Sequence, residues 1–138
     1  MDNKIKCGGI VIIQDEKVLL VKHGPKAEHL NDTFGIPSGR LDKNESELNC
    51  AIRELKEETN LDVLEEDLIQ LPNPYVATIE RKKEETKTFS MIVFKCNKFL
   101  GKLESNEETI PIWVNLSELD KLNLLPNVKK IIYDSMNN

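Results

Sequence analysis

Residues 39–61 read GRLDKNESELNCAIRELKEETNL, and this stretch decides how the rest of the sequence is interpreted. Apolar side chains recur in it at helical spacing and form one stripe, which predicts a helix packed against a core. The stripe consists of Leu48, Ala51, Ile52 and Leu55. Asn44, followed three residues later by Glu47, fits a capping box and predicts the start of the helix. We expect the helix to end near Thr59 and Asn60.

The opposite face of the predicted helix carries three carboxylates. Glu54, Glu57 and Glu58 occupy positions i, i+3 and i+4, which share one face of a helix. This arrangement opposes helix formation, because like charges four residues apart cost about 0.2–0.5 kcal/mol and the helix dipole disfavours anions in the last turn. A divalent cation would reverse the effect, since carboxylates are the hard oxygen ligands that Mg²⁺ accepts. Taken alone, the same residues also fit a solvated acidic face whose negative charge is partly compensated by Arg53 and Lys56.

The spacing of the polar residues resembles the Nudix box, G-x5-E-x7-R-E-U-x-E-E-x-G-U, in which U is aliphatic. The matching fixed positions are Gly39, Glu45, Arg53, Glu54, Glu57 and Glu58. Asn60 replaces the last Gly of the box, and Asn is the next best residue for the left-handed conformation that ends a helix. Ser38 stands where the family often has another Gly. The resemblance extends to residues 34–37, with the sequence FGIP, and to residues 112–119, with the sequence IWVNLSEL.

This resemblance implies a fold and an activity. The fold would be an α/β/α sandwich around a mixed β-sheet, and residues 1–138 would form a single domain. The activity would be Mg²⁺-dependent hydrolysis, with Mn²⁺ as a substitute, of the diphosphate linkage between a nucleoside diphosphate and another group X. A nucleoside monophosphate would be released. Such a pyrophosphatase has a small-molecule nucleotide as its partner.

The resemblance also implies the roles of the box residues. Metal ligands would be Glu54, Glu57, Glu58 and the backbone carbonyl of Gly39. The catalytic residues would be Glu54, Arg53 and Glu57. Arg53 would orient a carboxylate, and Glu54 would be either a metal ligand or the general base. Glu45 would support the loop or assist the metal indirectly.

Residues outside the box are further candidates. The family often recruits another carboxylate, and Glu107 is our first choice for it ahead of Glu108, Glu84 and Glu85, although each also fits a surface position. Lys22 and His23 end a strand beside a polar loop and are candidates for phosphate contacts. Five aromatic residues could stack on a base: Phe34, Tyr75, Phe89, Phe94 and Trp113. Core packing is expected for most of them, and Phe34 and Tyr75, which lie near Pro and turns, are the better candidates.

The flanking sequence predicts strands around the central helix. Residues 5–14 and 18–22 form a hairpin, and further strands are expected at 67–72, 75–81, 86–98 and 110–114. A short helix is expected at 115–121. Pro126 fits the first turn of a terminal helix whose apolar face is Val128, Ile131, Ile132 and Met136. This order places the chain in the α/β (α+β) class.

Composition excludes several other classes of protein. The net charge of −5 and the pI of about 5.2 disfavour nucleic-acid binding, which needs clustered Lys and Arg. No apolar run approaches the roughly 20 residues that span a bilayer, so no membrane association is expected. The start of the chain lacks the apolar stretch of a signal peptide, and the three cysteines form no close pair, which indicates a cytoplasmic protein. The sequence is compatible with either a monomer or a homodimer.

Two other functions fit the same resemblance. The first is a nucleotide-sensing binding module that does not turn over its ligand, although such domains usually lose box carboxylates that this sequence keeps. The second is isomerase chemistry on an isoprenoid diphosphate, which would need a positioned Cys and Glu pair that the sequence does not place. The identity of X is not determined at this level.

Overall fold

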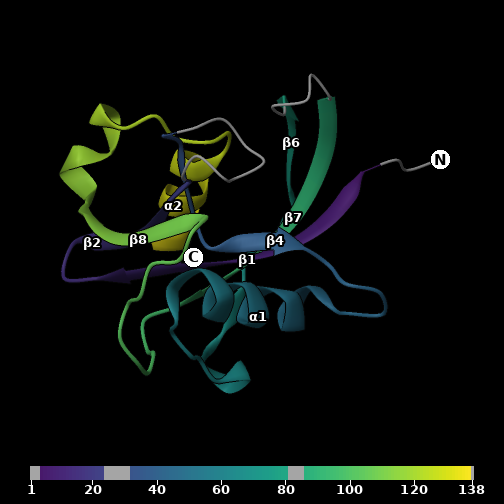
Figure 1. Cartoon of the computed structure of the whole chain (residues 1–138), viewed down its shortest axis with the longest axis horizontal. Coiled ribbons are helices and arrows are strands. Elements are labelled where there is room, and N and C mark those ends of the chain that lie inside the picture. The colour runs from purple at the N-terminus through teal and green to yellow at the C-terminus, as the bar shows by residue number, and fades with distance from the viewer. Residues whose placement is uncertain (1–3, 24–31, 81–85, 138) are drawn as a thin grey trace.

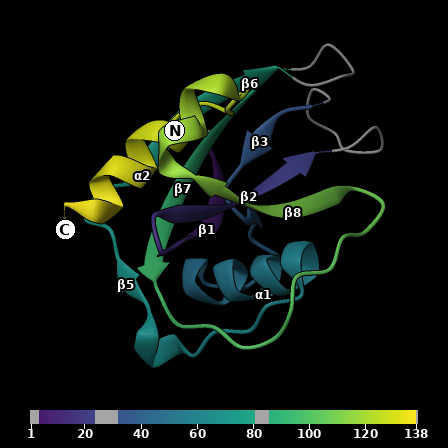
Figure 2. The same cartoon turned by 90° about the vertical axis from the view of Figure 1, so that its left-hand side faces the viewer.

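The computed structural model describes residues 4–23, 32–80 and 86–137, in which one β-sheet lies between two helices (Figures 1 and 2). The elements in chain order are β1 (Ile5–Gln14), β2 (Lys17–His23), β3 (Phe34–Gly35), β4 (Ser38–Arg40), α1 (Glu47–Thr59), β5 (Ile69–Gln70), β6 (Tyr75–Glu80), β7 (Thr86–Cys96), β8 (Thr109–Asn115) and α2 (Val128–Met136). Two 3₁₀ turns, at Glu65–Asp67 and Leu116–Lys121, complete the chain. Within the described residues, no helix is long and apolar enough to span a membrane.

The sheet is mixed, as expected from the sequence. β1 and β7 pair in parallel from Ile5 opposite Phe89 to Ile12 opposite Cys96. The remaining pairs are antiparallel, including the predicted hairpin of β1 with β2 and the pairing of β1 with the short strand β4. β6 lies against β7, and β8 lies against β2. β1 therefore holds the segment that precedes α1 directly against the centre of the sheet.

Alternation along the strands divides the apolar side chains between two cores. One core lies between the sheet and α2 and includes Val11, Val18, Leu20, Ile131 and Ile132. The other lies between the sheet and α1 and includes Ile10, Ile12, Leu19, Ala51 and Leu55. Successive residues of β1 and β2 thus point to opposite faces, as the two-residue period of a strand requires. This confirms the α/β/α sandwich.

Helix α1 begins two residues later than the prediction at Asn44. Its N-cap is Ser46, whose Oγ accepts from the Asn49 amide at 3.1 Å. Asn44 has a φ of 65°, which is incompatible with the extended backbone of an N-cap. The end of the helix was predicted correctly, because Asn60 has a φ of 72° and its amide donates to the Lys56 carbonyl.

Two other boundaries and one residue of a predicted apolar face differ from the predictions. Pro126 precedes α2, whose N-cap is Asn127 with a φ of 70°, so the proline lies outside the first turn. Met136 of the predicted apolar face is 45% exposed. The segment predicted as a strand at 67–72 forms only the two residues of β5, because a 3₁₀ turn takes up the residues before it.

Candidate active site

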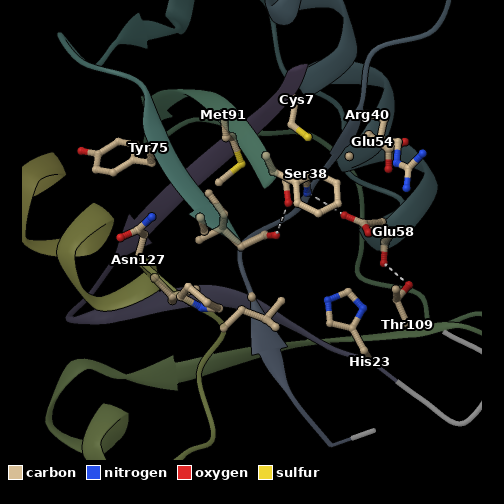
Figure 3. Close-up of a pocket in the computed structure, with 18 of the residues that line it drawn as sticks. Cys7, His23, Ser38, Arg40, Glu54, Glu58, Tyr75, Met91, Thr109 and Asn127 are labelled. Carbon is tan, nitrogen blue, oxygen red and sulfur yellow. Dashed lines mark hydrogen bonds between the residues drawn. The ribbon is translucent and has the colours of Figure 1, made fainter. Parts of the chain in front are cut away.

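A cavity of about 560 Å³ opens between α1, the sheet and the start of α2. Glu54 and Glu58 of α1 line one side of it, and Tyr75 and Asn127 line the other (Figure 3). Two of the three predicted helix carboxylates therefore face one space. Glu57 is the more exposed of the set, with 56% of its side chain accessible, and it is not among the described lining residues.

Arg53 organises the carboxylates around it. Its guanidinium donates two hydrogen bonds to Glu45, from Nε and Nη2, each at 2.8 Å. Its Nη1 donates to Glu54 Oε1 at 2.8 Å and to Glu57 at 3.2 Å. A further bond from Nη2 to the Arg40 carbonyl, at 3.0 Å, ties the helix to the end of β4. The planar fork of an arginine suits this role, because it holds several acceptors in fixed directions.

The two ends of this network have opposite electrostatic properties. The hydrogen bonds from Arg53 lower the pKa of Glu45 to about 2, so Glu45 stays ionised and acts as the fixed counterion of the arginine. Burial, with the charge of Glu57 beside it, raises the pKa of Glu54 to about 7. Glu45 therefore anchors the guanidinium, whereas Glu54 is a carboxylate whose charge is only partly compensated.

Glu58 is the more deeply placed carboxylate. Its Oε1 accepts from the Ser38 amide at 2.8 Å, which points the carboxylate toward β4 (Figure 3). Burial raises the pKa of Glu58 well above its ordinary value, and the negative charges of Glu54, Glu57 and Glu108 raise it further. Clustered buried carboxylates without a cation either take up protons or bind a metal ion.

Gly39 is required by the close approach of β4 to Glu54. A Cβ at this position would lie 2.2 Å from Glu54 Cδ and 2.4 Å from its Oε2. Any side chain would therefore displace the carboxylate. The requirement for glycine at this position is steric, since the structure shows no positive φ for Gly39.

The carbonyls of Ser38 and Gly39 point in opposite directions. The Ile10 amide donates to the Pro37 carbonyl at 3.0 Å, so the backbone groups of Pro37 face β1. In an antiparallel pair every second residue faces the partner strand, so the backbone groups of Gly39 face β1 as well. The Gly39 carbonyl also accepts from the Cys50 thiol at 3.2 Å. Ser38 lies between them, and its backbone groups face away from β1, on the side of the α1 carboxylates. The backbone groups of Gly39 thus face β1, whereas those of Ser38 face α1, where the Ser38 amide donates to Glu58.

The donor set fits a hard divalent cation. Within residues 4–23, 32–80 and 86–137, no three Asp, Glu, His or Cys side chains converge closely enough to hold a metal ion as they stand. The reason is visible in the contacts, because Arg53 holds Glu57 and the Ser38 amide holds Glu58. The available donors are nevertheless all oxygens, the ligands that hard divalent cations prefer, and burial together with the neighbouring negative charges raises the pKa of Glu54 and Glu58.

The other predicted residues are distributed unequally around the cavity. His23 is buried, lines the cavity and lies across the β2–β8 ladder from Thr109. Lys22 is instead paired with Asp32 at 3.4 Å and is not among the described lining residues. Phe34 packs against the core on the α2 side. Tyr75 lines the cavity, and its hydroxyl donates to Asp134 at 2.6 Å.

The structure separates the candidates for the additional carboxylate. Glu108 lines the cavity, whereas Glu107, the first choice from the sequence, is not among the described lining residues. Glu84 and Glu85 lie outside the described residues.

Several lining residues were not assigned to the site from the sequence, and one of them is Phe89, for which core packing was the preferred expectation. Phe89 and Met91 of β7, with Ala77 of β6, form an apolar wall of the cavity. The Arg40 guanidinium lies 5.6 Å from the centre of the Phe89 ring, in a cation–π contact. The alternating apolar residues of the strand at 86–98 contained a signal for this wall, but the face that they present depends on the parallel pairing with β1.

Comparisons with known proteins agree with this architecture. The model of the NUDIX domain family matches residues 6–135. The fold is similar to that of a MutT NUDIX hydrolase from Burkholderia pseudomallei, at 19% identity and a TM-score of 0.78 over 96% of this chain and 98% of that one. It is also similar to the NUDIX domain of NrtR from Shewanella oneidensis, a cocrystal with ADP ribose, at 16% identity and a TM-score of 0.76 over 99% and 89% of the chains. An Ap4A hydrolase from C. elegans aligns over 97% of both chains, at 22% identity and a TM-score of 0.63. At these identities the similarity to the solved structures concerns the fold.

Proposed function

Because the chain belongs to the NUDIX domain family and is a pyrophosphohydrolase of the Nudix type, we propose that it cleaves the diphosphate linkage of a nucleoside diphosphate attached to another group, in an Mg²⁺-dependent reaction. One observation carries the proposal: the same cavity is lined by crowded carboxylates and by apolar and aromatic side chains. A diphosphate needs cations to approach an acidic site, and a base needs a surface on which to stack. The two sets of lining residues meet these two requirements.

The residues that would hold the metal ions come from three segments. They are Glu57 and Glu58 of α1, the Ser38 carbonyl of β4, and Glu108 before β8, and this leaves Glu54 as the general base. When bound, Mg²⁺ lowers the pKa of a coordinated water and neutralises the charge of the phosphates. Mn²⁺ fits the same oxygen donors.

The protein side chains orient the reacting groups. Arg53 fixes Glu54 through Oε1, and Glu45 holds Arg53 in place with two hydrogen bonds. We assign Glu54 Oε2 to accept the proton of the attacking water, because Oε1 already accepts the hydrogen bond from Arg53. This assignment is supported by the raised pKa of Glu54, because a general base functions best when its pKa lies near the working pH.

The apolar side of the cavity would receive the nucleoside. Tyr75 and Phe89 offer ring faces or edges, and Met91 adapts to the shape of a bound base. His23, at the other end of the cavity beside Thr109, lies where a phosphate or its leaving group would be contacted.

A substrate panel with a metal control tests the proposal. ADP-ribose, Ap4A and nucleoside triphosphates would be incubated with the protein in Mg²⁺, in Mn²⁺ and in excess EDTA, and products would be separated by chromatography. We expect release of a nucleoside monophosphate from at least one compound, and loss of that activity in EDTA. Activity that is unchanged by EDTA would contradict the metal mechanism.

A pair of variants separates the enzyme from a binding module. Glu58→Gln should reduce turnover by about 10²-fold or more, since it removes a charge from the metal cluster. Glu118→Gln is the matched control, because Glu118 pairs with Lys121 on the surface 3₁₀ turn and does not line the cavity. Tight binding of a nucleotide without any turnover, by wild-type protein in Mg²⁺, would favour the sensing function instead.

A further inference from the structure

The C-terminal end of α1 is closed by a distant segment of the chain. The last carbonyls of a helix have no partner within the helix and need donors from elsewhere. In α1, the Glu57 carbonyl accepts from Asn106 Nδ2 at 2.9 Å, and the Glu58 carbonyl accepts from Thr109 Oγ1 at 3.2 Å. The Thr59 carbonyl accepts from the Glu104 amide at 3.1 Å. Residues 104–109 therefore cap the turn of the helix that carries the carboxylates.

Asn106 joins this cap to the loop before β8. While its Nδ2 binds the helix, its Oδ1 accepts from the amides of Glu108 and Thr109, each at 2.8 Å. The backbone amide of Asn106 in turn donates to the Thr109 carbonyl at 3.0 Å. One side chain thus uses its donor on the helix and its acceptor on the loop. An aspartate would keep only the acceptor, and an alanine would keep neither.

The loop ordered by Asn106 brings a carboxylate to the cavity. Glu108 lines the cavity with Glu58, and the residue after it, Thr109, is hydrogen-bonded to the Glu58 carbonyl. Figure 3 shows Thr109 beside Glu58, joined to it by the bond to its carbonyl. The position of Glu108 relative to the helix carboxylates therefore depends on the contacts between the loop and the end of α1.

We propose that Asn106 is a positioning residue that sets the spacing between Glu108 and the carboxylates of α1, and thereby the affinity of the site for divalent cations. The inference rests on the proposed function, because it assigns the same carboxylates to the metal. Asn106 acts through Glu57 and Glu108 and does not touch the substrate. Outer partners of this kind typically change metal affinity or activity by about 10–100-fold when they are removed.

The test uses Mn²⁺ alone as the probe, with the full-length protein in the absence of substrate. Mn²⁺ binding is measured by titration calorimetry and by the electron paramagnetic resonance of free Mn²⁺, for wild-type protein, Asn106→Ala and Asn106→Asp. We expect the dissociation constant to rise by about 10-fold in both variants. The aspartate variant is the sharper one, since an added anion by itself would strengthen cation binding. Weaker Mn²⁺ binding in that variant therefore has to come from a changed spacing between Glu108 and the carboxylates of α1.

Two further variants separate positioning from general stability. Thr109→Val keeps the buried, β-branched shape but removes the hydroxyl that binds the Glu58 carbonyl, so it should weaken Mn²⁺ binding in the same direction. Gln14→Ala is the matched control, because Gln14 also donates from a side-chain amide to a carbonyl, that of Asn97, away from the cavity. Gln14→Ala should leave Mn²⁺ binding unchanged.

The outcomes distinguish this inference from the proposed function. If wild-type protein binds Mn²⁺ and both Asn106 variants bind it within two-fold of wild type, the positioning role is wrong and the metal mechanism stands. If wild-type protein binds no Mn²⁺ and hydrolyses nothing in the panel, both are wrong. In the expected case, Mg²⁺-dependent turnover should show a lower kcat with little change in KM for the nucleotide.

Discussion

Replacing Glu54 with Gln tests the electrostatic account of the site most directly. Burial and the neighbouring Glu57 raise the pKa of Glu54 from 4.5 to about 7. A carboxyl group whose pKa is raised on folding stabilises the protein fully below its unfolded pKa, and this stability is lost as the pH rises through the folded pKa. Metal-free wild-type protein should therefore lose stability between about pH 4.5 and pH 7. The glutamine variant carries no charge there and should not lose that contribution.

The size of the effect follows from the same values. A rise in pKa from 4.5 to about 7 corresponds to about 3 kcal/mol, at about 1.36 kcal/mol for each pKa unit. Glutamine keeps an acceptor for Arg53 Nη1, which binds Glu54 at 2.8 Å, but the bond loses its charge assistance at a cost of about 1–2 kcal/mol. The net gain at pH 8 is then about 1–2 kcal/mol. For a domain of this size it should raise the melting temperature by roughly 3–7 °C.

Thermal melts in EDTA at pH 5 and pH 8 measure this gain, with Glu118→Gln as the control for removing a surface carboxylate. Glu54→Gln should melt above wild type at pH 8 and close to it at pH 5. In Mg²⁺, the same variant should lose about 10²–10⁴-fold in turnover, the range expected for a general base. Two results would refute the reasoning. One is a variant that melts below wild type at pH 8. The other is a variant whose melting temperature differs from that of wild type by the same amount at both pH values.

Three further predictions follow from the geometry of the site. Gly39→Ala should reduce turnover by about 10²-fold or more and destabilise the protein only moderately, because its Cβ would lie 2.2 Å from Glu54 Cδ and the flexible side chain would move away; equal turnover in the two proteins would argue against this contact. Asn60→Val should destabilise the protein by about 1–3 kcal/mol in chemical denaturation, since a β-branched residue fits poorly at a φ of 72°, whereas Asn60→Gly should be nearly neutral. Glu108→Gln should lower kcat more than Glu107→Gln, because Glu108 lines the cavity; steady-state kinetics showing the reverse order would restore Glu107 as the better candidate.

Local patterns predicted the elements better than their ends. The apolar stripe of α1 was identified correctly because a helix repeats every 3.6 residues whatever surrounds it. The start of α1 was placed at Asn44, but the turn before the helix is held by Glu45, which accepts two hydrogen bonds from Arg53 eight residues later. A contact of this kind is invisible to a capping rule that considers only neighbouring residues. The same applies to Pro126, since the left-handed backbone of Asn127 delays the start of α2.

The family of the protein and the carboxylates of its helix were determined by the sequence alone. The spacing of Glu54, Glu57 and Glu58 places them on one face of any helix that forms, and the surrounding box defines the fold to which that helix belongs. Only the tertiary structure decided which backbone carbonyl faces them, because the direction of the Ser38 and Gly39 carbonyls depends on the register of β4 against β1. The tertiary structure likewise selected Glu108 over Glu107 as a lining residue and formed the apolar wall of the cavity. These features result from pairing between segments that are distant in the chain, and the free energy of such pairing is not encoded in the spacing of any one segment.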